Sequence, residues 1–502
     1  MSGAGCAERK YVNMGCRPQL SEAEYRPQCG WARKANESMA LPWKGVAMRA
    51  FLATYGCQAN ERDSETMLGM LKQMGYQETD EEKNADLILL NTCSIRDKAE
   101  QKVFSYLGVL RQYKLDKPDL VIGLCGCMAQ ESDIADIIRR RAPHVDFVLG
   151  THRLHRLPDM IRDAQAGAGF QSDREETAEI VESLPSVRPH PFKALINITF
   201  GCDNYCAYCI VPYVRGRERS RGMEDILAES RLRVEEGASE LMYLGQNVNA
   251  YGKKRGNPPE GGGQGQMRPE DRQIQKDASF ADLLYRAQKI AGLERIRFLT
   301  SHPKDFGQDL IEAIAGCPKV SRHIHLPVQS GSSRILEQMN RGYDRDEYLA
   351  LASRIRRQIP DVTLTTDVIV GFPGETEEDL QDTIDLLNRV GFGSAFTFMF
   401  SPRKGTPAAE MAGQIPLQEK KIRLQAVMDV QAANNLHIHQ GLVGRELRVL
   451  AESWGEGLLS GRGEGNQLTY FAGGPEGIGR FHRVKITKAR IWTLEGESCG
   501  YA

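Results

Sequence analysis

The sequence predicts an α/β protein of about three domains: a doubly wound α/β domain, an incomplete parallel barrel and a small antiparallel β-barrel. The length of 502 residues allows about three domains at roughly 150 residues each. Between residues 48 and 401, short apolar strands alternate with helical segments, which is typical of parallel sheets. After residue 444, short strands and glycine-rich turns follow one another, a pattern that favours an antiparallel barrel.

The composition indicates a globular chain and limits the chemical states that we expect for its cysteines. Hydrophobic residues make up 41% and charged residues 26%, and the net charge is -1, so neither disorder nor a uniformly basic surface is expected. No apolar run is long enough for a membrane-spanning helix. The first 48 residues contain no apolar leader, so we expect the protein in the reducing cytoplasm. There the twelve cysteines would be free, catalytic or metal-bound.

The first domain is expected at residues 48–165, after a flexible extension at 1–47 that lacks helical or strand periodicity. Within it, apolar runs alternate with segments whose apolar residues recur at helical spacing. The strands are expected at 48–55, 85–91 and 120–124, and the helices at 61–74, 100–113 and 134–141. This alternation predicts a parallel, doubly wound sheet.

The second domain is expected at residues 188–425, after a polar linker at 166–187. Its strands are expected at 194–199, 240–245, 295–299, 323–326, 363–370 and 394–400, with helical segments between them. About six such units predict an incomplete parallel (β/α)6 barrel. The segment 253–277 is rich in glycine and charge, which indicates a surface insertion.

The third domain is expected at residues 438–502 and follows a polar helix at 416–441. Its strands are expected at 444–451, 457–464, 468–471 and 481–492, with glycine-rich turns between them. Closure of such strands into a small barrel would leave no exposed sheet edge.

The strongest local signal for chemistry is a C-x3-C-x2-C motif formed by Cys202, Cys206 and Cys209. It follows an expected barrel strand, on the face where parallel barrels build their sites. Three thiolates at this spacing can bind three irons of a 4Fe–4S cluster and leave the fourth open to a small molecule. A structural zinc site would need a fourth ligand, and the neighbouring sequence supplies none.

The run Gly-Cys-Asp-Asn-Tyr-Cys-Ala-Tyr-Cys at 201–209, continued as Pro-Tyr-Val-Arg-Gly-Arg-Glu-Arg-Ser-Arg at 212–221, closely resembles the radical S-adenosylmethionine methylthiotransferases. The resemblance covers nearly the whole chain from Met48. It implies a 4Fe–4S cluster at the motif that binds S-adenosylmethionine. It also implies a second, auxiliary 4Fe–4S cluster on Cys57, Cys93 and Cys127, each of which follows an expected strand.

From the residues alone, these three cysteines are more simply interpreted as small buried hydrophobes, because isolated cysteines usually are. Their shared position at the carboxyl ends of successive strands favours a common site. Cys125 lies two residues before Cys127, and we expect it to pack in the core while the family pattern selects Cys127. The cysteines that match no ligand motif are interpreted as incidental: Cys6, Cys16, Cys29, Cys317 and Cys499.

Polar and glycine-rich strand ends of the expected barrel are candidates for holding the cofactor nucleoside, because glycine allows close approach and polar side chains can bind ribose hydroxyls. The alternative is that they form tight turns between strand and helix. The candidates are Gly245, Gln246, Asn247, Gln329, Ser330, Asp367, Gly371 and Glu375. A second set beside the cysteine motif could anchor cofactor or substrate, or form surface ion pairs: Arg215, Glu218 and Arg221.

The last domain resembles the TRAM module, an OB-like RNA-binding domain. Its expected last strand carries cations without an intervening acid, flanked by the aromatic residues Phe481 and Trp492. Cations for phosphates and aromatic rings for stacking predict contact with looped or single-stranded RNA. An alternative is an edge strand protected by charge. The candidate RNA-binding residues are Arg480, Arg483, Lys485, Lys488 and Arg490.

The resemblance implies a tRNA methylthiotransferase. The radical cluster would cleave S-adenosylmethionine to a 5′-deoxyadenosyl radical, and the auxiliary cluster would supply a sulfur methylated from a second S-adenosylmethionine. The run Gly-Gln-Asn-Val-Asn-Ala-Tyr at 245–251 resembles the branch that acts on N6-isopentenyladenosine at position 37 of tRNA. A looped adenosine is easier to splay out than a paired one.

Two other functions are kept as alternatives. The same chemistry could act on N6-threonylcarbamoyladenosine or on a ribosomal-protein aspartate, and a different class is a non-catalytic iron–sulfur protein that binds RNA. The enzyme interpretation implies further partners, namely an electron donor such as flavodoxin or ferredoxin and iron–sulfur carrier proteins, and no membrane.

Overall fold

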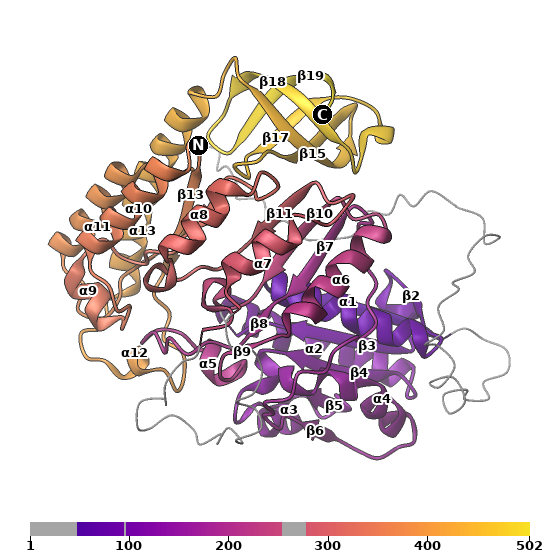
Figure 1. Ribbon diagram of the computed structural model, residues 1–502. Coiled ribbons are helices and arrows are strands. Elements are labelled where there is room, and N and C mark those ends of the chain that lie inside the picture. The colour runs from indigo at the N-terminus through magenta and orange to yellow at the C-terminus, as the bar shows by residue number, and fades with distance from the viewer. Residues whose placement is uncertain (1–47, 95–96, 254–277) are drawn as a thin grey trace, which may run out of the picture.

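The computed structural model describes residues 48–94, 97–253 and 278–502. The expected extension at 1–47 and nearly all of the expected insertion at 253–277 lie outside the described residues. Three units follow one another from the bottom to the top of Figure 1: a sheet domain, a larger domain with parallel strands, and a small barrel at the C-terminal end. None of the helices in the described ranges combines the length and the apolar character needed to cross a membrane.

The N-terminal domain is one parallel sheet of six strands in the order β2-β1-β3-β4-β5-β6. Its elements are β1 Arg49–Thr54, α1 Gln58–Gln73, β2 Gln77–Glu78, β3 Leu87–Thr92, α2 Asp97–Asp116, β4 Val121–Gly126, α3 Ile134–Arg141, β5 Phe147–Leu149, α4 Leu157–Gln165 and β6 Gln171–Asp173. The central strands β3 and β4 are buried along their whole length, with apolar clusters on both faces. The order reverses between β1 and β3, which is the switch point where such sheets bind ligands.

The doubly wound prediction is confirmed, with two differences in detail. Strand β2 has only two residues, too few to show a period in the sequence. Strand β6 lies inside the expected linker at 166–187, because its polar residues pair with β5 at the sheet edge and need no apolar pattern.

The central domain carries six parallel strands in chain order. They are β7 Lys193–Asn197, β10 Glu240–Leu244, β11 Arg295–Phe298, β12 His323–His325, β13 Thr363–Val370 and β14 Ser394–Met399. They form two three-stranded sheets, β11-β10-β7 and β12-β13-β14, which a bridge between Ile296 and Val320 connects. Strands β7 and β14 are the two outer edges, so the barrel is open, as predicted.

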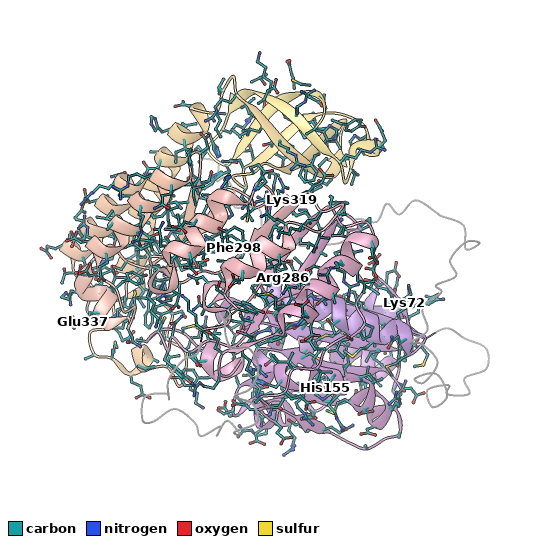
Figure 2. The ribbon with its side chains drawn as sticks, in the orientation of Figure 1. Lys72, His155, Arg286, Phe298, Lys319 and Glu337 are labelled. Carbon is teal, nitrogen blue, oxygen red and sulfur yellow. The ribbon has the colours of Figure 1, made fainter. Side chains whose placement is uncertain are left out.

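Helices connect or follow these strands, and the longer ones cover the outer side of the barrel. They are α5 Val211–Val214, α6 Met223–Glu235, α7 Phe280–Ala287, α8 Gln308–Gly316, α9 Ser333–Gln338, α10 Arg345–Gln358, α11 Glu377–Val390, α12 Pro407–Glu410 and α13 Leu417–Gln440. Figure 2 shows Phe298 on the helix-covered side, and its ring packs edge-on against Phe280 of α7 with 5.2 Å between centroids. A short antiparallel pair, β8 Thr199–Phe200 with β9 Arg219–Ser220, closes the loop after β7.

The C-terminal domain is a closed barrel in the order β15-β16-β17-β19-β18. Its strands are β15 Glu446–Gly455, β16 Leu458–Arg462, β17 Leu468–Ala472, β18 Phe481–Ala489 and β19 Thr493–Tyr501. The single strand expected at 481–492 is wrong, because the chain reverses after Ala489 and the amide of Arg490 donates to the carbonyl of Thr493 at 2.9 Å. The basic strand is therefore the penultimate one.

The turn between β16 and β17 docks onto the amino ends of the central strands. Arg295 donates to the carbonyl of Arg462 at 3.1 Å, and Arg297 donates to that of Gly463 at 2.5 Å. Both guanidiniums also bind the buried carboxylate of Glu240, at 2.5 and 2.9 Å. Burial opposes ionisation of this carboxyl, but the cations Arg297 and Arg295 outweigh it and lower the pKa of Glu240 from 4.5 to about 2.

The C-terminal barrel and the N-terminal domain thus occupy opposite ends of the central barrel. In Figure 2, Lys319 lies beside the C-terminal barrel at the top, and His155 lies in the N-terminal domain at the bottom. The carboxyl ends of the central strands, where parallel barrels place their sites, are directed toward the N-terminal domain.

We expect Glu240→Gln to destabilise the protein by about 3–5 kcal/mol at neutral pH, because it removes the buried carboxylate that both guanidiniums share and leaves Arg297 without an ion-pair partner among the described residues. The folded pKa of Glu240 lies below the ordinary value, so its stabilisation is present above about pH 4.5 and is lost as pH falls toward 2. The variant should therefore lose less stability than wild type on acidification through this range. Calorimetric unfolding across pH measures both effects.

The exposed Glu235→Gln variant on α6 is the matched control and should leave the transition unchanged. A Glu240→Gln protein with wild-type stability at neutral pH would contradict the proposed role of this ion cluster.

Candidate metal centres

Three cysteines follow the carboxyl ends of three adjacent strands at the switch point of the N-terminal sheet. Cys57 precedes α1 at the end of β1, Cys93 follows β3, and Cys127 follows β4. Cys93 and Cys127 are buried, each 4% exposed, whereas Cys57 is exposed. Cys125 packs in the core formed with α1 and α4, as expected of a structural thiol.

A buried amide network holds the three strand ends together. The side-chain nitrogen of Asn60 donates to Asn91 Oδ1 and to the carbonyl of Thr92, both at 3.0 Å. Asn91 returns a hydrogen bond to the carbonyl of Asn60 and donates to Ser64 Oγ, both at 2.8 Å. The amide of Cys127 donates to the carbonyl of Thr92 at 2.8 Å. The residues flanking each cysteine therefore fix the loops against one another.

Gly126 is required for this arrangement. Its φ of +91° lies in the region that favours glycine, and a Cβ there would lie 2.4 Å from Asn91 Oδ1. The tight turn allows Cys127 to leave the sheet while Cys125 stays in it.

The motif cysteines of the central domain lie in the loop after β8. Cys202 and Cys206 are buried, and Cys209 is half-buried. Gly201 has a φ of +72°, and a Cβ on it would lie 2.1 Å from the carbonyl oxygen of Arg217. Arg217 in turn binds Asp203 at 2.7 Å, which holds the loop against the following segment.

The thiols of this loop lie close enough to affect one another. Burial raises the pKa of Cys209 to about 12, with a contribution from the neighbouring Cys206 thiol. Burial also raises the pKa of Cys202, with contributions from Cys209, Cys206 and Glu218. Ionisation of three such thiols needs a positive charge, and a coordinated metal supplies one. The donor set therefore fits the cluster that the motif predicts.

Arg341 is a site residue that the sequence analysis missed. It is 4% exposed and donates to Cys206 Sγ at 3.4 Å and to the carbonyl of Pro327 at 2.7 Å. Its neighbour Asn340 donates to the carbonyl of Tyr205 at 3.0 Å. The segment after α9 thus holds the cysteine loop through contacts between distant parts of the chain, and no local motif marks these contacts.

The two cysteine sets lie on either side of one domain contact. Cys127 packs against Ile210, which follows Cys209, and against Val214 of α5. Arg215 was expected to anchor cofactor or substrate, but its guanidinium donates to Cys127 Sγ at 3.2 Å and to Asp63 at 2.7 Å. Asp63, on α1, was not anticipated from the sequence.

The other two expected anchors differ from each other. Glu218 acts electrostatically on Cys202, as a residue beside the motif should. Arg221 instead binds Glu182 and Glu229, at 2.5 and 2.7 Å, in a buried network between the linker and α6. This engagement gives Arg221 a structural role and leaves its expected anchoring role without support.

Among the expected cofactor residues, the group after β10 approaches the cysteine loop directly. Gln246 accepts a hydrogen bond from the amide of Gly201 at 2.6 Å, and a Cβ on Gly245 would lie 2.0 Å from Thr199 Oγ1. Asn247 donates to Asp305 at 2.8 Å, whereas its buried Oδ1 has no hydrogen-bond partner among the described residues. An unsatisfied buried acceptor of this kind fits a ligand.

Of the other residues expected to bind the cofactor, some lie toward the interior of the barrel and others are held by contacts with neighbouring loops and helices. Gln329 adopts a φ of +76° in the loop after β12, and Ser330 packs against α11. Glu375 accepts from the amide of Gly371 at 3.0 Å and binds Arg423 at 2.7 Å, so its carboxylate is already engaged. These contacts favour the alternative of tight turns for Ser330, Gly371 and Glu375.

Aromatic side chains line the interior face of the open edge strand β14. Phe396 and Phe398 are 58% and 38% exposed, large fractions for phenylalanine. Phe396 lies beside Asp367 in the strand register, and its ring packs edge-on against His325 at 6.0 Å. His325 also lies 3.4 Å from the carboxylate of Asp367. The interior therefore offers an apolar surface next to polar groups.

The basic strand of the C-terminal barrel is exposed but partly neutralised. Arg480, Arg483 and Lys485 are exposed and form no salt bridge with another described residue. By contrast, Glu495 of β19 pairs with both Lys488 and Arg490. The expected stacking role of Phe481 is wrong, since this ring is 3% exposed and lies under Arg448, whereas Trp492 is 58% exposed. Strand alternation turns residue 481 inward.

Among the residues that the structure describes, no three histidine, cysteine or carboxylate side chains converge on a point that would hold a single metal ion. We therefore infer the two candidate centres from the placement of the thiols at strand ends and from the hydrogen-bond donors that surround them.

Three family models match the chain along its length. They are an uncharacterized protein family, UPF0004, at residues 49–150, the radical SAM superfamily at residues 196–387, and the TRAM domain at residues 440–498.

Curated relatives match most of the chain. The tRNA-2-methylthio-N(6)-dimethylallyladenosine synthase of Moorella thermoacetica is 46% identical over 89% of this chain and 97% of its own length. The enzyme of the same name from Acetivibrio thermocellus is 44% identical over 89% and 90%. Among solved structures, the radical S-adenosylmethionine methyltransferase TsrM of Kitasatospora setae aligns over 81% of this chain and 79% of its own, at 11% identity and a TM-score of 0.50, and shares the fold.

We expect Asn91→Ala to lose iron from the N-terminal centre alone, because the substitution removes three buried hydrogen bonds that hold the segments next to Cys57 and Cys93 against each other. Reconstituted iron should fall from about eight per chain to about four, and folding should lose about 1–3 kcal/mol. Iron analysis and calorimetry measure the two effects.

Asn84→Ala, which removes one exposed hydrogen bond to Glu81, serves as control and should retain all iron. Retention of all iron by Asn91→Ala would show that the network does not position the cysteines.

Proposed function

Because the chain belongs to the family of tRNA-2-methylthio-N6-dimethylallyladenosine synthases, we propose that its two cysteine sets hold two 4Fe–4S clusters that act on one adenosine of tRNA. The chain is a radical S-adenosylmethionine tRNA methylthiotransferase. Its reaction converts N6-isopentenyladenosine, the dimethylallyl nucleoside at position 37 beside the anticodon, to the 2-methylthio derivative.

One observation carries the proposal for two clusters: the two cysteine sets flank a single contact, where Cys127 packs on the residue that follows Cys209. A reaction that needs a radical and a sulfur source at one carbon requires both close to the substrate. Cys202, Cys206 and Cys209 would hold the radical cluster, and Cys57, Cys93 and Cys127 the auxiliary cluster.

When bound, the two clusters would supply the electron that cleaves S-adenosylmethionine and the sulfur that enters the product. The protein side chains then orient and shield the reacting groups. Arg341 donates to the ligand Cys206, and Gln246 fixes the loop before Cys202. Asn247 Oδ1 is a buried acceptor available to S-adenosylmethionine.

The interior of the barrel suits a prenylated base. Phe396 and Phe398 offer apolar surface for the base and its hydrocarbon tail, and Asp367 with His325 offers hydrogen-bonding groups beside it. Relatives named for the dimethylallyl nucleoside favour this substrate over N6-threonylcarbamoyladenosine and a ribosomal-protein aspartate. The match to the radical superfamily disfavours a non-catalytic RNA-binding protein.

We also propose binding partners and a cellular location for the protein. The exposed cations of β18, with Trp492 beside them, would hold tRNA through phosphate contacts and stacking. A flavodoxin- or ferredoxin-type donor would supply electrons, and iron–sulfur carriers would rebuild the auxiliary cluster. A cytoplasmic location provides the reducing conditions and the tRNA that this reaction needs.

The two cysteine sets can be separated by paired triple variants. We expect Cys202→Ala/Cys206→Ala/Cys209→Ala to abolish both 5′-deoxyadenosine and methylthio product, because no radical forms. Cys57→Ala/Cys93→Ala/Cys127→Ala should still yield 5′-deoxyadenosine but no methylthio product. Each variant should retain about four irons against about eight in wild type. Mass spectrometry of nucleosides and iron analysis provide the readouts.

Cys317→Ala, in a buried thiol of the barrel core, controls for cysteine loss in general and should retain all iron. Tests in a strain that lacks the gene identify the substrate: full 2-methylthio-N6-isopentenyladenosine in its tRNA would refute the proposed function. Wild-type protein with about four irons would refute the two-cluster account.

For RNA binding, we expect Arg483→Ala and Lys485→Ala each to weaken tRNA affinity and to reduce the salt slope of binding by about 1. Lys488→Ala and Arg490→Ala should have smaller effects, because Glu495 already pairs with both side chains. Filter binding at several salt concentrations measures the slope.

Lys72→Ala, an exposed cation in the N-terminal domain, is the matched control. Equal losses from all five variants would indicate non-specific charge rather than an RNA surface on β18.

A further inference from the structure

A buried arginine of the central domain reaches a candidate ligand in the N-terminal domain. Arg215 follows α5 and has 6% of its surface exposed. Its Nε donates to Cys127 Sγ at 3.2 Å, and its Nη2 donates to Asp63 Oδ2 at 2.7 Å. The guanidinium therefore joins the two domains at one thiol.

The surrounding chain fixes the guanidinium in this place. Thr151 Oγ1 donates to the carbonyl of Val214 at 2.7 Å, which ties α5 to the N-terminal domain. Gly216 has a φ of +70°, and a Cβ on it would lie 2.7 Å from the ring of His152. The backbone on both sides of Arg215 is thus seated against the N-terminal domain, and the side chain has little freedom to leave Cys127.

A cationic donor at a cluster thiolate has a definite electronic effect. Hydrogen bonds to sulfur and net local charge set the reduction potential of iron–sulfur clusters. The reduced cluster carries one more negative charge, so a guanidinium beside it stabilises that state and raises the potential. The Asp63 carboxylate opposes this effect, because it offsets part of the same positive charge.

We propose that Arg215 is a positioning residue that sets the reduction potential of the auxiliary cluster. It acts from across the domain interface through its hydrogen bond to Cys127, and the Asp63 carboxylate offsets part of its charge. The inference rests on the proposed function, in that it requires a cluster on Cys57, Cys93 and Cys127. Arg341 holds the equivalent position at the other centre, where its Nη1 lies 3.4 Å from Cys206 Sγ. Each centre therefore has its own arginine.

The test is a redox titration of the reconstituted full-length protein, in which electron paramagnetic resonance follows the two clusters separately. Arg215→Met should lower the auxiliary potential by at least about 59 mV, which corresponds to a tenfold change for one electron, and leave the radical cluster unchanged. Arg215→Lys keeps the charge but not the fixed fork, so it should shift the potential in the same direction by less.

Asp63→Asn tests the direction in which the reduction potential of the auxiliary cluster shifts. It keeps the size of the side chain but removes the negative charge, so the auxiliary potential should rise, opposite to the Arg215 variants. A merely structural role would disturb the site in the same direction in all variants. Arg286→Met, in an arginine of α7 that binds Glu224 on the helix-covered side of the barrel, is the control and should shift neither potential.

The outcomes separate the two hypotheses. Wild-type protein that holds only about four irons refutes the two-cluster proposal itself. Wild-type protein with about eight irons, combined with an unchanged auxiliary potential in Arg215→Lys and Asp63→Asn, overturns the role of Arg215. If Arg215→Met does not retain the auxiliary cluster, the opposite shifts of the other two variants decide the question.

Discussion

The architecture depends on one constraint of parallel sheets: all carboxyl ends of the strands emerge on the same side. This chain contains one parallel sheet in the N-terminal domain and two in the central barrel, and the carboxyl ends of the strands of the two domains are directed toward one another. The loops that carry Cys57, Cys93 and Cys127 therefore approach the loop that carries Cys202, Cys206 and Cys209, although more than seventy residues separate Cys127 from Cys202 in the chain. Cys127, Ile210 and Val214 form the apolar contact at this meeting point.

Burial gives the surrounding polar residues their importance. Thiols in a dry interface resist ionisation, so the protein surrounds them with donors whose own positions are fixed. Arg341 and Arg215 each contact one thiol and at least one other partner. The asparagine network between Asn60 and Asn91 does the same for the backbone. Positioning in this site is shared between side chains that touch sulfur and side chains that hold the loops.

Sequence patterns could predict what is local. The alternation of strands and helices predicted the parallel strands of the first two domains. The spacing of Cys202, Cys206 and Cys209 predicted their shared loop. Contacts between distant segments could not be predicted in this way: Arg341 reaches Cys206, and Asp63 reaches Arg215, through the tertiary fold alone. The reversal at residues 490–492 was missed because no glycine, proline, asparagine or aspartate marks the turn. The strand that follows it carries the Glu495 that pairs with Lys488 and Arg490. For Arg221 the sequence left both an anchoring role and an ion-paired role open, and its ion pairs with Glu182 and Glu229 favour the second.

Because the C-terminal barrel docks on the amino ends of the central strands, the basic strand and the reaction centre lie at opposite ends of the central barrel. Strand β13 has eight residues, which span about 25 Å at roughly 3.3 Å each. It runs from Thr363, which accepts a hydrogen bond from Gln467 of the C-terminal barrel, to the carboxyl face near the cysteines. An RNA that touches both the basic strand and the reaction centre must therefore bridge at least this length along the outside of the barrel. The buried Glu240 cluster joins the two domains at one end of that span, so a tRNA held on the basic strand as proposed would be selected partly by distance along the folded RNA and not by base identity alone.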